Sequence, residues 1–236
     1  MPAVQAPRGR ERLAGGALPP ALPRIAPFAV YILILILSSL LAGDDGMPPP
    51  VWLYPLQIGL VAALLLVCWR HYDELHGSLH SILRGCAAAL LLGLLVFVAW
   101  INLDVAVLSM GLTPSVPPRA ADGGLILWWV AVRLLGAALI VPLMEELFWR
   151  SFLMRWIVGA DFQGINPASV GLRAVLVSSL VFGVEHQLWF AGFLAGCAYA
   201  WLYMRSGKLW HAVLAHGITN LALGVWVLAT GNWQFW

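Results

Sequence analysis

The hydrophobic positions of the chain gather in long continuous runs and do not alternate with polar ones. Seven runs stand out, rich in Leu, Ala and Val, at about 25–42, 51–69, 85–103, 123 to beyond 144, 169–186, 188–204 and 209–230. Runs of this length favour membrane-spanning helices, because the strands of a membrane barrel are shorter and alternate in polarity. The pattern predicts an all-α polytopic membrane protein with about seven transmembrane helices, or eight.

The composition supports this class of protein. Of the 236 residues, 61% are hydrophobic and only 10% are charged, whereas a soluble domain carries about 25% charged residues. So little charge cannot cover the surface of a water-soluble protein of this size. The composition therefore excludes an ordinary soluble enzyme, a disordered chain and a nucleic-acid-binding domain, and it makes the lipid bilayer the expected surroundings.

The basic residues predict the orientation in the membrane. With the N-terminus placed in the cytoplasm, eleven of the thirteen Lys and Arg residues fall on the cytoplasmic side. These are Arg8, Arg10, Arg12, Arg24, Arg70, Arg84, Arg150, Arg155, Arg173, Arg205 and Lys208. Because cytoplasmic loops are enriched in Lys and Arg, we expect a cytoplasmic N-terminus and a C-terminus on the opposite side.

Three parts follow from the order of these features. Residues 1–24 are rich in Pro, Arg, Ala and Gly and predict a disordered cytoplasmic tail. Residues 25–122 hold the first transmembrane helices, and residues 123–236 form a second helical region that carries nearly all of the unusual polar residues. In its sixth hydrophobic run, Gly192, Gly196 and Ala200 recur every four residues, which predicts a smooth face for close helix packing.

The first unusual polar group is Glu145-Glu146 followed by Arg150, directly after an apolar run. An ionisable side chain in the middle of a bilayer costs about 2.5–3.5 kcal/mol on insertion scales, so such residues suggest a functional site. Glu146 and Arg150 are four residues apart and can pair on one helix face. Glu145 is rotated by about 100° from Glu146 and can face a cavity. A helix end whose charges simply reach water fits the spacing equally well.

Two further groups lie closer to the C-terminus. Phe182 is followed four residues later by His186 at the end of the fifth run, where Glu185 is expected to face solvent. His216 and Asn220 are four residues apart inside the seventh run and share a helix face. Either pair could serve only structural hydrogen bonds between helices.

Together these groups supply the parts of a hydrolytic site. Glu145, His186, His216 and Asn220 provide a carboxylate, two imidazoles and an amide. A carboxylate and an imidazole can orient and deprotonate a water, and an imidazole and an amide can donate hydrogen bonds to an oxyanion. This set of groups is what peptide hydrolysis by an activated water requires.

The three motifs, in this order and each in an apolar helix, resemble those of a known family. Glu145-Glu146-x-x-x-Arg150, Phe182-x-x-x-His186 and His216-x-x-x-Asn220 are similar to the EExxxR, FxxxH and HxxxN/D motifs of the CAAX protease and bacteriocin-processing (Abi) family. The resemblance covers about residues 125–230. The chain is also similar to a bacterial subgroup, the CAAX prenyl protease-related proteins found with exosortase systems, which implies a bacterial inner membrane.

The resemblance implies a glutamate-type intramembrane endopeptidase without a metal cofactor. By analogy, Glu145 and His186 would activate the water, and His216 and Asn220 would form the oxyanion hole. Glu146, Arg150 and Phe182 would support these four residues. The substrate would be a membrane-associated peptide or protein, such as one with a prenylated C-terminus, a leader peptide or the remnant of a sorting tail.

Two other hypotheses use the same residues. In the first, Glu145, His186 and His216 bind zinc and leave the fourth position to a water, although no HExxH motif is present. In the second, the chain is a non-catalytic membrane scaffold or a transporter with a proton relay. The glutamate hypothesis has a geometric difficulty, because counting seven spans places His186 toward the outer side and Glu145 near the inner side. It therefore requires tilted or unequal helices, with the fourth continuing toward Val158.

Overall fold

The computed structural model describes residues 18–41, 49–111, 117–120 and 122–236. Within these residues there is no β-strand, only an isolated bridge between Arg119 and Leu125, so the predicted all-α fold is confirmed. The α-helices are α1 Leu22–Leu41, α2 Leu53–Val67, α3 Leu79–Leu83, α4 Cys86–Asn102, α5 Leu127–Leu135, α6 Val141–Glu146, α7 Met154–Trp156, α8 Leu172–Val184, α9 Trp189–Ser206 and α10 Leu209–Thr230. Short 3-10 turns cover Trp69–His71, Asp73–Leu75, Ala106–Leu108, Phe162–Gly164, Pro167–Ser169 and Trp233–Phe235.

Each of the seven predicted runs contains one of the longer helices. Within the described part of the chain, three helices are long and apolar enough to cross a membrane, namely α1, the continuous helix Leu127–Trp156 and α10. Helices α2, α4 and α8 are apolar but shorter. The helices indicate an integral membrane protein, while the number of spans and the cytoplasmic N-terminus remain predictions.

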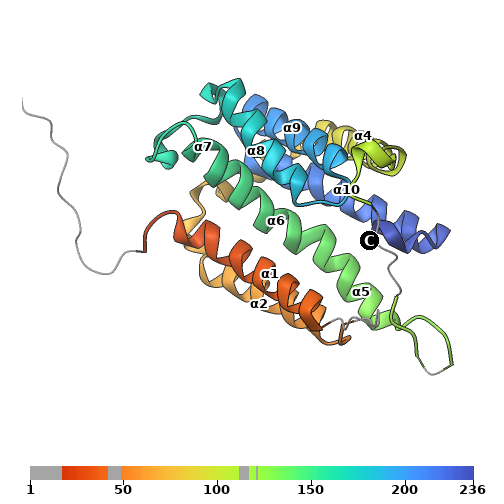
Figure 1. Cartoon of the computed structure of the whole chain (residues 1–236). Helices are drawn as coiled ribbons and strands as arrows, with labels where there is room; N and C mark the ends of the chain where they lie inside the picture. Colours follow the sequence, from red (N-terminus) through yellow and green to blue (C-terminus); the bar gives the residue numbers. More distant parts are fainter. Residues whose placement is uncertain (1–17, 42–48, 112–116, 121) are drawn as a thin grey trace, which may run out of the picture.

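A single long helix organises the fold. Helices α5, α6 and α7 join through two π-helical segments, Gly136–Ile140 and Leu147–Leu153, into one helix of 30 residues. Figure 1 shows α1 and α2 on one side of this helix and α4, α8, α9 and α10 on the other. At 1.5 Å per residue it extends over about 45 Å, more than the roughly 30 Å of a hydrocarbon core. The fourth helix therefore does continue, as expected, and ends at Trp156.

The first π segment precedes a proline. Pro142 stands at the start of α6 and has no N–H to donate to the carbonyls of the preceding turn. Helices often widen or bend where the hydrogen-bond ladder is interrupted in this way. The sequence thus builds a local irregularity into the middle of the long helix, three residues before Glu145.

The predicted boundary of the N-terminal tail at residue 24 lies too far along the chain, as the position of Arg24 shows. Helix α1 begins at Leu22 instead of residue 25, and Arg24 is only 1% exposed. Its guanidinium pairs with Glu74 at 2.5 Å and donates to the carbonyls of Pro20 and His71. A basic residue that appeared to belong to the tail is buried because these oxygen acceptors surround it, whereas the predicted tail residues 1–17 lie outside the described residues.

The ion pair of Arg24 and Glu74 also holds the short turns after α2 against the long helix, through Ser151. Ser151 donates to Glu74 and also lies within hydrogen-bond distance of Arg24. Burial alone would raise the pKa of Glu74, but the hydrogen bonds and the positive charge of Arg24 outweigh it and the pKa is lowered. Glu74 therefore stays ionised and fixes three separate segments at one end of the bundle.

The small residues of α9 pack closely against α8, as predicted. A Cβ atom on Gly196 would lie 2.8 Å from Cβ of Ser179, and one on Gly192 would lie 3.0 Å from Cα of Gly183. Both distances are shorter than an ordinary carbon contact, so only glycine allows the two helices to approach this far. Helix α9 then ends at Gly207, which adopts the left-handed conformation with φ 66°.

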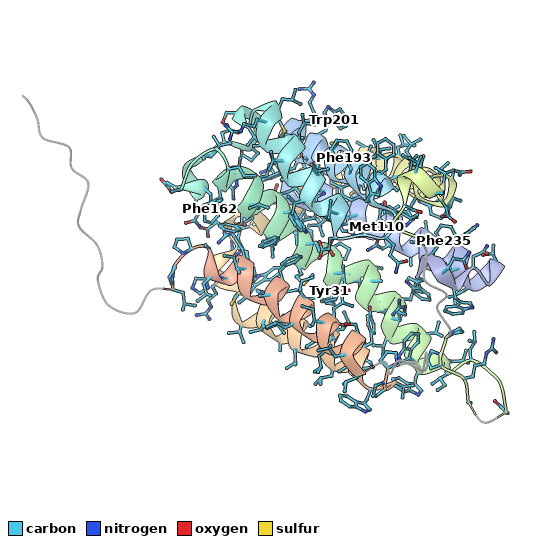
Figure 2. The ribbon with its side chains drawn as sticks, viewed as in Figure 1. Tyr31, Met110, Phe162, Phe193, Trp201 and Phe235 are labelled. Carbon is cyan, nitrogen blue, oxygen red and sulfur yellow. The ribbon has the colours of Figure 1, made fainter. Side chains whose placement is uncertain are left out.

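The outward faces of the helices carry large apolar side chains. Leu66, Leu91 and Trp201 are 72%, 63% and 57% exposed, and Figure 2 shows Trp201 on the outside of the bundle. Many more Leu, Val and Ile side chains face outward in the same way. A surface of this kind is stable where lipid chains cover it.

Candidate active site

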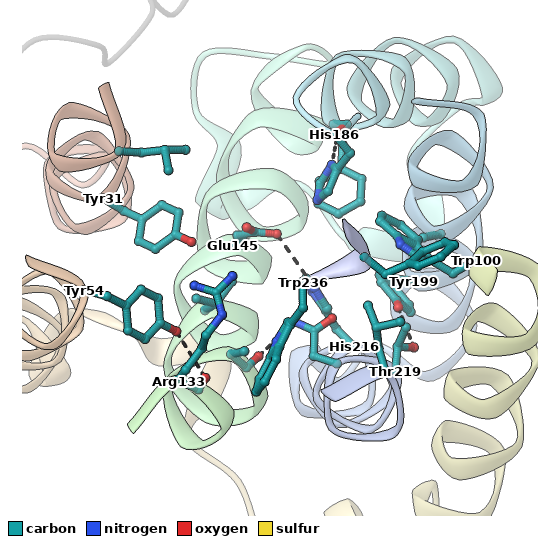
Figure 3. A pocket seen from close by; sticks show the side chains of 18 of the residues that line it. Tyr31, Tyr54, Trp100, Arg133, Glu145, His186, Tyr199, His216, Thr219 and Trp236 are labelled. Carbon is teal, nitrogen blue, oxygen red and sulfur yellow. Dashed lines mark hydrogen bonds and ion pairs between the residues drawn. The ribbon is translucent and has the colours of Figure 1, made fainter. Parts of the chain in front are cut away.

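A cavity of about 300 Å³ lies between the long helix, α1 and α10. All four predicted catalytic residues line it, namely Glu145, His186, His216 and Asn220. Phe182, predicted as a supporting residue, also reaches its wall. Figure 3 shows how side chains from helices far apart in the sequence point into this one space.

Glu146 and Arg150 form a buried ion pair beside the cavity. Arg150 Nη1 donates to Glu146 Oε1 at 2.9 Å, and both side chains are almost completely buried. The guanidinium also lies 4.4 Å from the ring centroid of Phe182 and donates to the carbonyl of Gly196 at 3.4 Å. The predicted pairing of residues four apart is confirmed, and the pair connects the long helix to α8 and α9.

Glu145 occupies the position that the helical rotation predicted. Its side chain lines the cavity, and its residue is only 4% exposed. Carboxylate oxygen Oε2 has no hydrogen-bond partner among the described residues. The nearest cation-forming group is His216, whose Nε2 lies 3.8 Å from this oxygen. One carboxylate oxygen is therefore directed into the cavity with its acceptor capacity unused.

His216 lies between the two glutamates. Its Nδ1 is 2.9 Å from Glu146 Oε1, and because an ionised carboxylate can only accept, Nδ1 carries the hydrogen. Nε2 then faces Glu145 and the cavity. The ring of Tyr199 stacks on the imidazole with centroids 4.9 Å apart, so the orientation of His216 is fixed from two directions.

His186 lies nearer to the other site residues than the simple count of spans predicted. Helix α8 has only 13 residues, about 20 Å of helix, which is too short to cross the hydrocarbon core. His186 follows directly after its end and lines the same cavity as Glu145. Nδ1 donates to the carbonyl of Phe182 at 2.8 Å, because a carbonyl can only accept, and this leaves Nε2 free. The separation from Glu145 that the count of spans implied is absent because α8 is short, while the side of the membrane toward which His186 lies stays a prediction.

Asn220 is held by the irregular part of the long helix. Its Nδ2 donates to the carbonyl of Ala137 at 2.8 Å, within the π segment that precedes Pro142. Pro142 cannot donate to the carbonyls before it, so the amide of Asn220 supplies a donor in this turn. A primary amide has two N–H bonds, and the second one remains available to the cavity.

Several residues of the site lie outside the three sequence motifs. Tyr199 stacks on His216 and donates to Thr219 Oγ1 at 2.7 Å. Arg133, Tyr31 and Trp236 also line the cavity. Arg133 carried a signal, since it is the basic residue inside a predicted span, but single aromatic residues in apolar helices are too common to single out.

The predicted zinc ligands do not converge as a metal site. Among the described residues, no group of three His, Cys, Asp or Glu side chains is arranged so that it could hold a metal ion. Glu145, His186 and His216 share the cavity, and each histidine keeps its Nε2 toward it because its Nδ1 is bound to Phe182 or to Glu146. The zinc hypothesis and the metal-free hypothesis both stay predictions.

The fold and the cavity define a membrane-embedded helical protein with a glutamate, two histidines and an asparagine around one buried space. Residues 127–222 match the family model described as Rce1-like, type II CAAX prenyl endopeptidase. This segment contains all three motifs, so the match confirms the resemblance and supports assigning the chain to the CAAX protease family. The family is a protease family. No curated protein and no solved structure gives a significant match to the chain.

Proposed function

We propose that the protein is a metal-independent intramembrane endopeptidase in which Glu145 and His186 activate a water. The observation that supports this most directly is the Glu145 carboxylate oxygen, which is buried, lines the cavity and lacks a hydrogen-bond partner among the described residues. A carboxylate in this position can accept a proton from a water. His186 Nε2, free because Nδ1 is bound to Phe182, can accept the second hydrogen bond of the same water.

The attack then proceeds as a general-base hydrolysis. Glu145 takes a proton from the water, the hydroxide oxygen bonds to the carbonyl carbon of the peptide, and negative charge develops on the carbonyl oxygen. When the tetrahedral intermediate collapses, the carbon–nitrogen bond breaks and Glu145 returns the proton to the leaving amine. Both proton transfers use the same group, Glu145, because a positioned carboxylate can act first as a base and then as an acid.

His216 and Asn220 would stabilise the developing oxyanion. Asn220 has one N–H left after its bond to Ala137, and hydrogen bonds of this kind strengthen as charge develops. His216 can donate from Nε2 when both ring nitrogens carry a proton, and its Nδ1 is already bound to Glu146. Glu146 and Arg150 act on the reaction only through the orientation of His216 and Phe182.

The substrate is proposed from the family and from the setting of the cavity. The matching family model is described as a type II CAAX prenyl endopeptidase, and the apolar outer surface of the helices supports a membrane setting, in which lipid-anchored peptides occur. A prenylated peptide with a C-terminal CAAX sequence is therefore the first substrate to test. Cleavage in a bilayer would need no metal.

The test is a cleavage assay with the full-length protein reconstituted in liposomes and a fluorescence-quenched prenylated CAAX peptide. Glu145→Gln removes the base with little change in shape and should lower kcat by about 10²–10⁴-fold. Asp73→Asn is the matched control, because Asp73 is exposed and does not line the cavity. It should keep the wild-type rate, and a chelator should leave that rate unchanged.

Undiminished cleavage by Glu145→Gln would contradict the role of this carboxylate. Loss of activity with the chelator, restored by zinc, would contradict the metal-independent mechanism. Folded wild-type protein that cleaves no peptide of this class would contradict the proposed substrate.

A further inference from the structure

Arg133 lines the cavity, and among the described residues its guanidinium has aromatic rings as its only partners. Its guanidinium carbon lies 5.2 Å from the ring centroid of Tyr54, 5.3 Å from that of Trp129 and 5.2 Å from that of Trp236. In the described part of the chain, the guanidinium makes no hydrogen bond and no ion pair with a carboxylate. Figure 3 shows Arg133 between Tyr54 and Trp236 at the wall of the cavity that contains Glu145.

The other arginines near the long helix are bound differently. Arg24 and Arg150 each pair with a glutamate, and Arg155 donates to the carbonyl and hydroxyl of Ser151. Aromatic rings cover the faces of a guanidinium, but its five N–H donors lie in its plane and point outward from the edges. Arg133 therefore keeps donors that no described residue of the protein engages.

The first π segment brings Arg133 to the face of the helix that carries Glu145. Twelve residues of regular α-helix turn by about 1200°, which would leave the two positions roughly 120° apart. A π segment takes up about one extra residue and removes about 100° of this rotation. The segment Gly136–Ile140 lies between them, and accordingly both side chains line the same cavity.

We propose that Arg133 binds the C-terminal carboxylate of the peptide that is cut beside Glu145. This subsite rests on the proposed endopeptidase function. A planar carboxylate matches the fork of guanidinium N–H groups and can accept two parallel hydrogen bonds. The rings of Tyr54, Trp129 and Trp236 limit the access of water to the pair, which strengthens it.

The separation along the helix sets the length of the released fragment. Twelve residues correspond to about 18 Å along the axis, and an extended peptide spans at most about 3.3–3.6 Å per residue. Because the side chains of Arg133 and Glu145 reach into the space between their backbone positions, the extended fragment between the cut bond and the bound carboxylate is no more than about five residues long. Arg133 would thus select for cleavage near the C-terminus of a substrate.

The experiment compares two forms of one prenylated CAAX peptide, with a free C-terminal carboxylate or with a C-terminal amide. The full-length protein is assayed in phosphatidylcholine nanodiscs. The wild type should prefer the carboxylate by about 10–100-fold in kcat/KM, as a hydrogen-bonded charge pair in a buried site predicts. Arg133→Met should lose this preference mainly through a higher KM for the carboxylate form. Arg133→Lys, which keeps the charge but not the fork, should retain only part of it.

Arg173→Met is the matched control, because Arg173 is exposed and does not line the cavity. It should keep the wild-type preference. If Arg133→Met lowers cleavage of both peptides equally, or leaves the preference intact, the subsite is overturned. Thermal unfolding of each variant separates a loss of folding from a loss of recognition.

A binding measurement separates this subsite from the proposed reaction. The Glu145→Gln protein is titrated with fluorescent versions of both peptides and followed by anisotropy. Preference for the carboxylate that depends on Arg133 would support the subsite even if the wild type cleaved neither peptide, a result that would count against the proposed function alone. Equal binding of both peptides would overturn the subsite. If phosphatidylglycerol in the nanodiscs abolishes the preference, the anionic group bound is a lipid phosphate and the assignment to the peptide is overturned.

Discussion

Replacing Arg150 by methionine tests whether the buried ion pair with Glu146 is essential to the fold. The substitution keeps an unbranched side chain of similar reach in the helix but removes the guanidinium. Glu146, which is 0% exposed, then loses the donor at 2.9 Å from its Oε1 and keeps only His216. A carboxylate without its cation is left inside the protein.

The expected cost follows from that burial. Removing one partner of a buried ion pair typically costs roughly 3–5 kcal/mol, because an uncompensated charge remains. For a protein of this size, 1 kcal/mol changes Tm by about 2–4 °C, so Tm should fall by roughly 6–20 °C. The double variant Glu146→Gln/Arg150→Met has no unpaired charge, and its new amide side chain would still offer an oxygen to His216. We expect it to be more stable than Arg150→Met by about 2 kcal/mol.

The assay is thermal unfolding of the purified protein in one detergent, followed through the complete double-mutant cycle. The contacts of Arg150 with the Phe182 and Tyr199 rings are lost in both Arg150 variants, so they cancel in the comparison. A change in Tm below about 2 °C for Arg150→Met, or strictly additive effects in the cycle, would refute the reasoning. Either result would mean that the charge of Glu146 is compensated elsewhere.

Three other predictions test separate parts of the structure. Gly196→Ala places a Cβ atom 2.8 Å from Ser179 and should destabilise the protein by about 1–3 kcal/mol in thermal unfolding, whereas Gly59→Ala, with open space around it, should be neutral. The lowered pKa of Glu74 adds stability at neutral pH that is lost as the pH falls below about 4.5 and through the folded-state pKa. Tm measured against pH should therefore decline in the acid range, and less steeply for Glu74→Gln. Asn220→Ala should lower kcat of the cleavage assay by about 10²–10³-fold, as for loss of an oxyanion donor, and an unchanged kcat would remove Asn220 from that role.

The pairing inside the first motif could be predicted because it depends on one helix. The four-residue spacing of Glu146 and Arg150 and the rotation of Glu145 away from them follow from helical geometry alone. The structure has the ion pair at 2.9 Å and Glu145 in the cavity wall. The close-packing face of Gly192 and Gly196 on α9 could be predicted for the same reason, although the sequence did not identify α8 as the helix that it contacts.

Contacts between helices could not be predicted in this way. The hydrogen bond from His216 to Glu146 joins residues 70 positions apart, and no periodicity relates them. The proximity of His186 to Glu145 could not be predicted, because an apolar run shows where a helix can form but not that α8 would end after 13 residues. Arg24 appeared to belong to a solvated tail, since its partner Glu74 lies 50 positions away.

The sequence by itself determined the class of protein, the helices and the chemical groups of the site. Hydrophobic runs and local spacing contain that information because a helix is a local structure with a fixed period. Only the tertiary structure decided which of these groups meet: the length of α8, the π segment before Pro142 and the close approach of α9 bring Glu145, His186, His216 and Asn220 to one cavity. Arg133 joins them for the same reason, because its place on the cavity wall depends on the rotation and packing of whole helices.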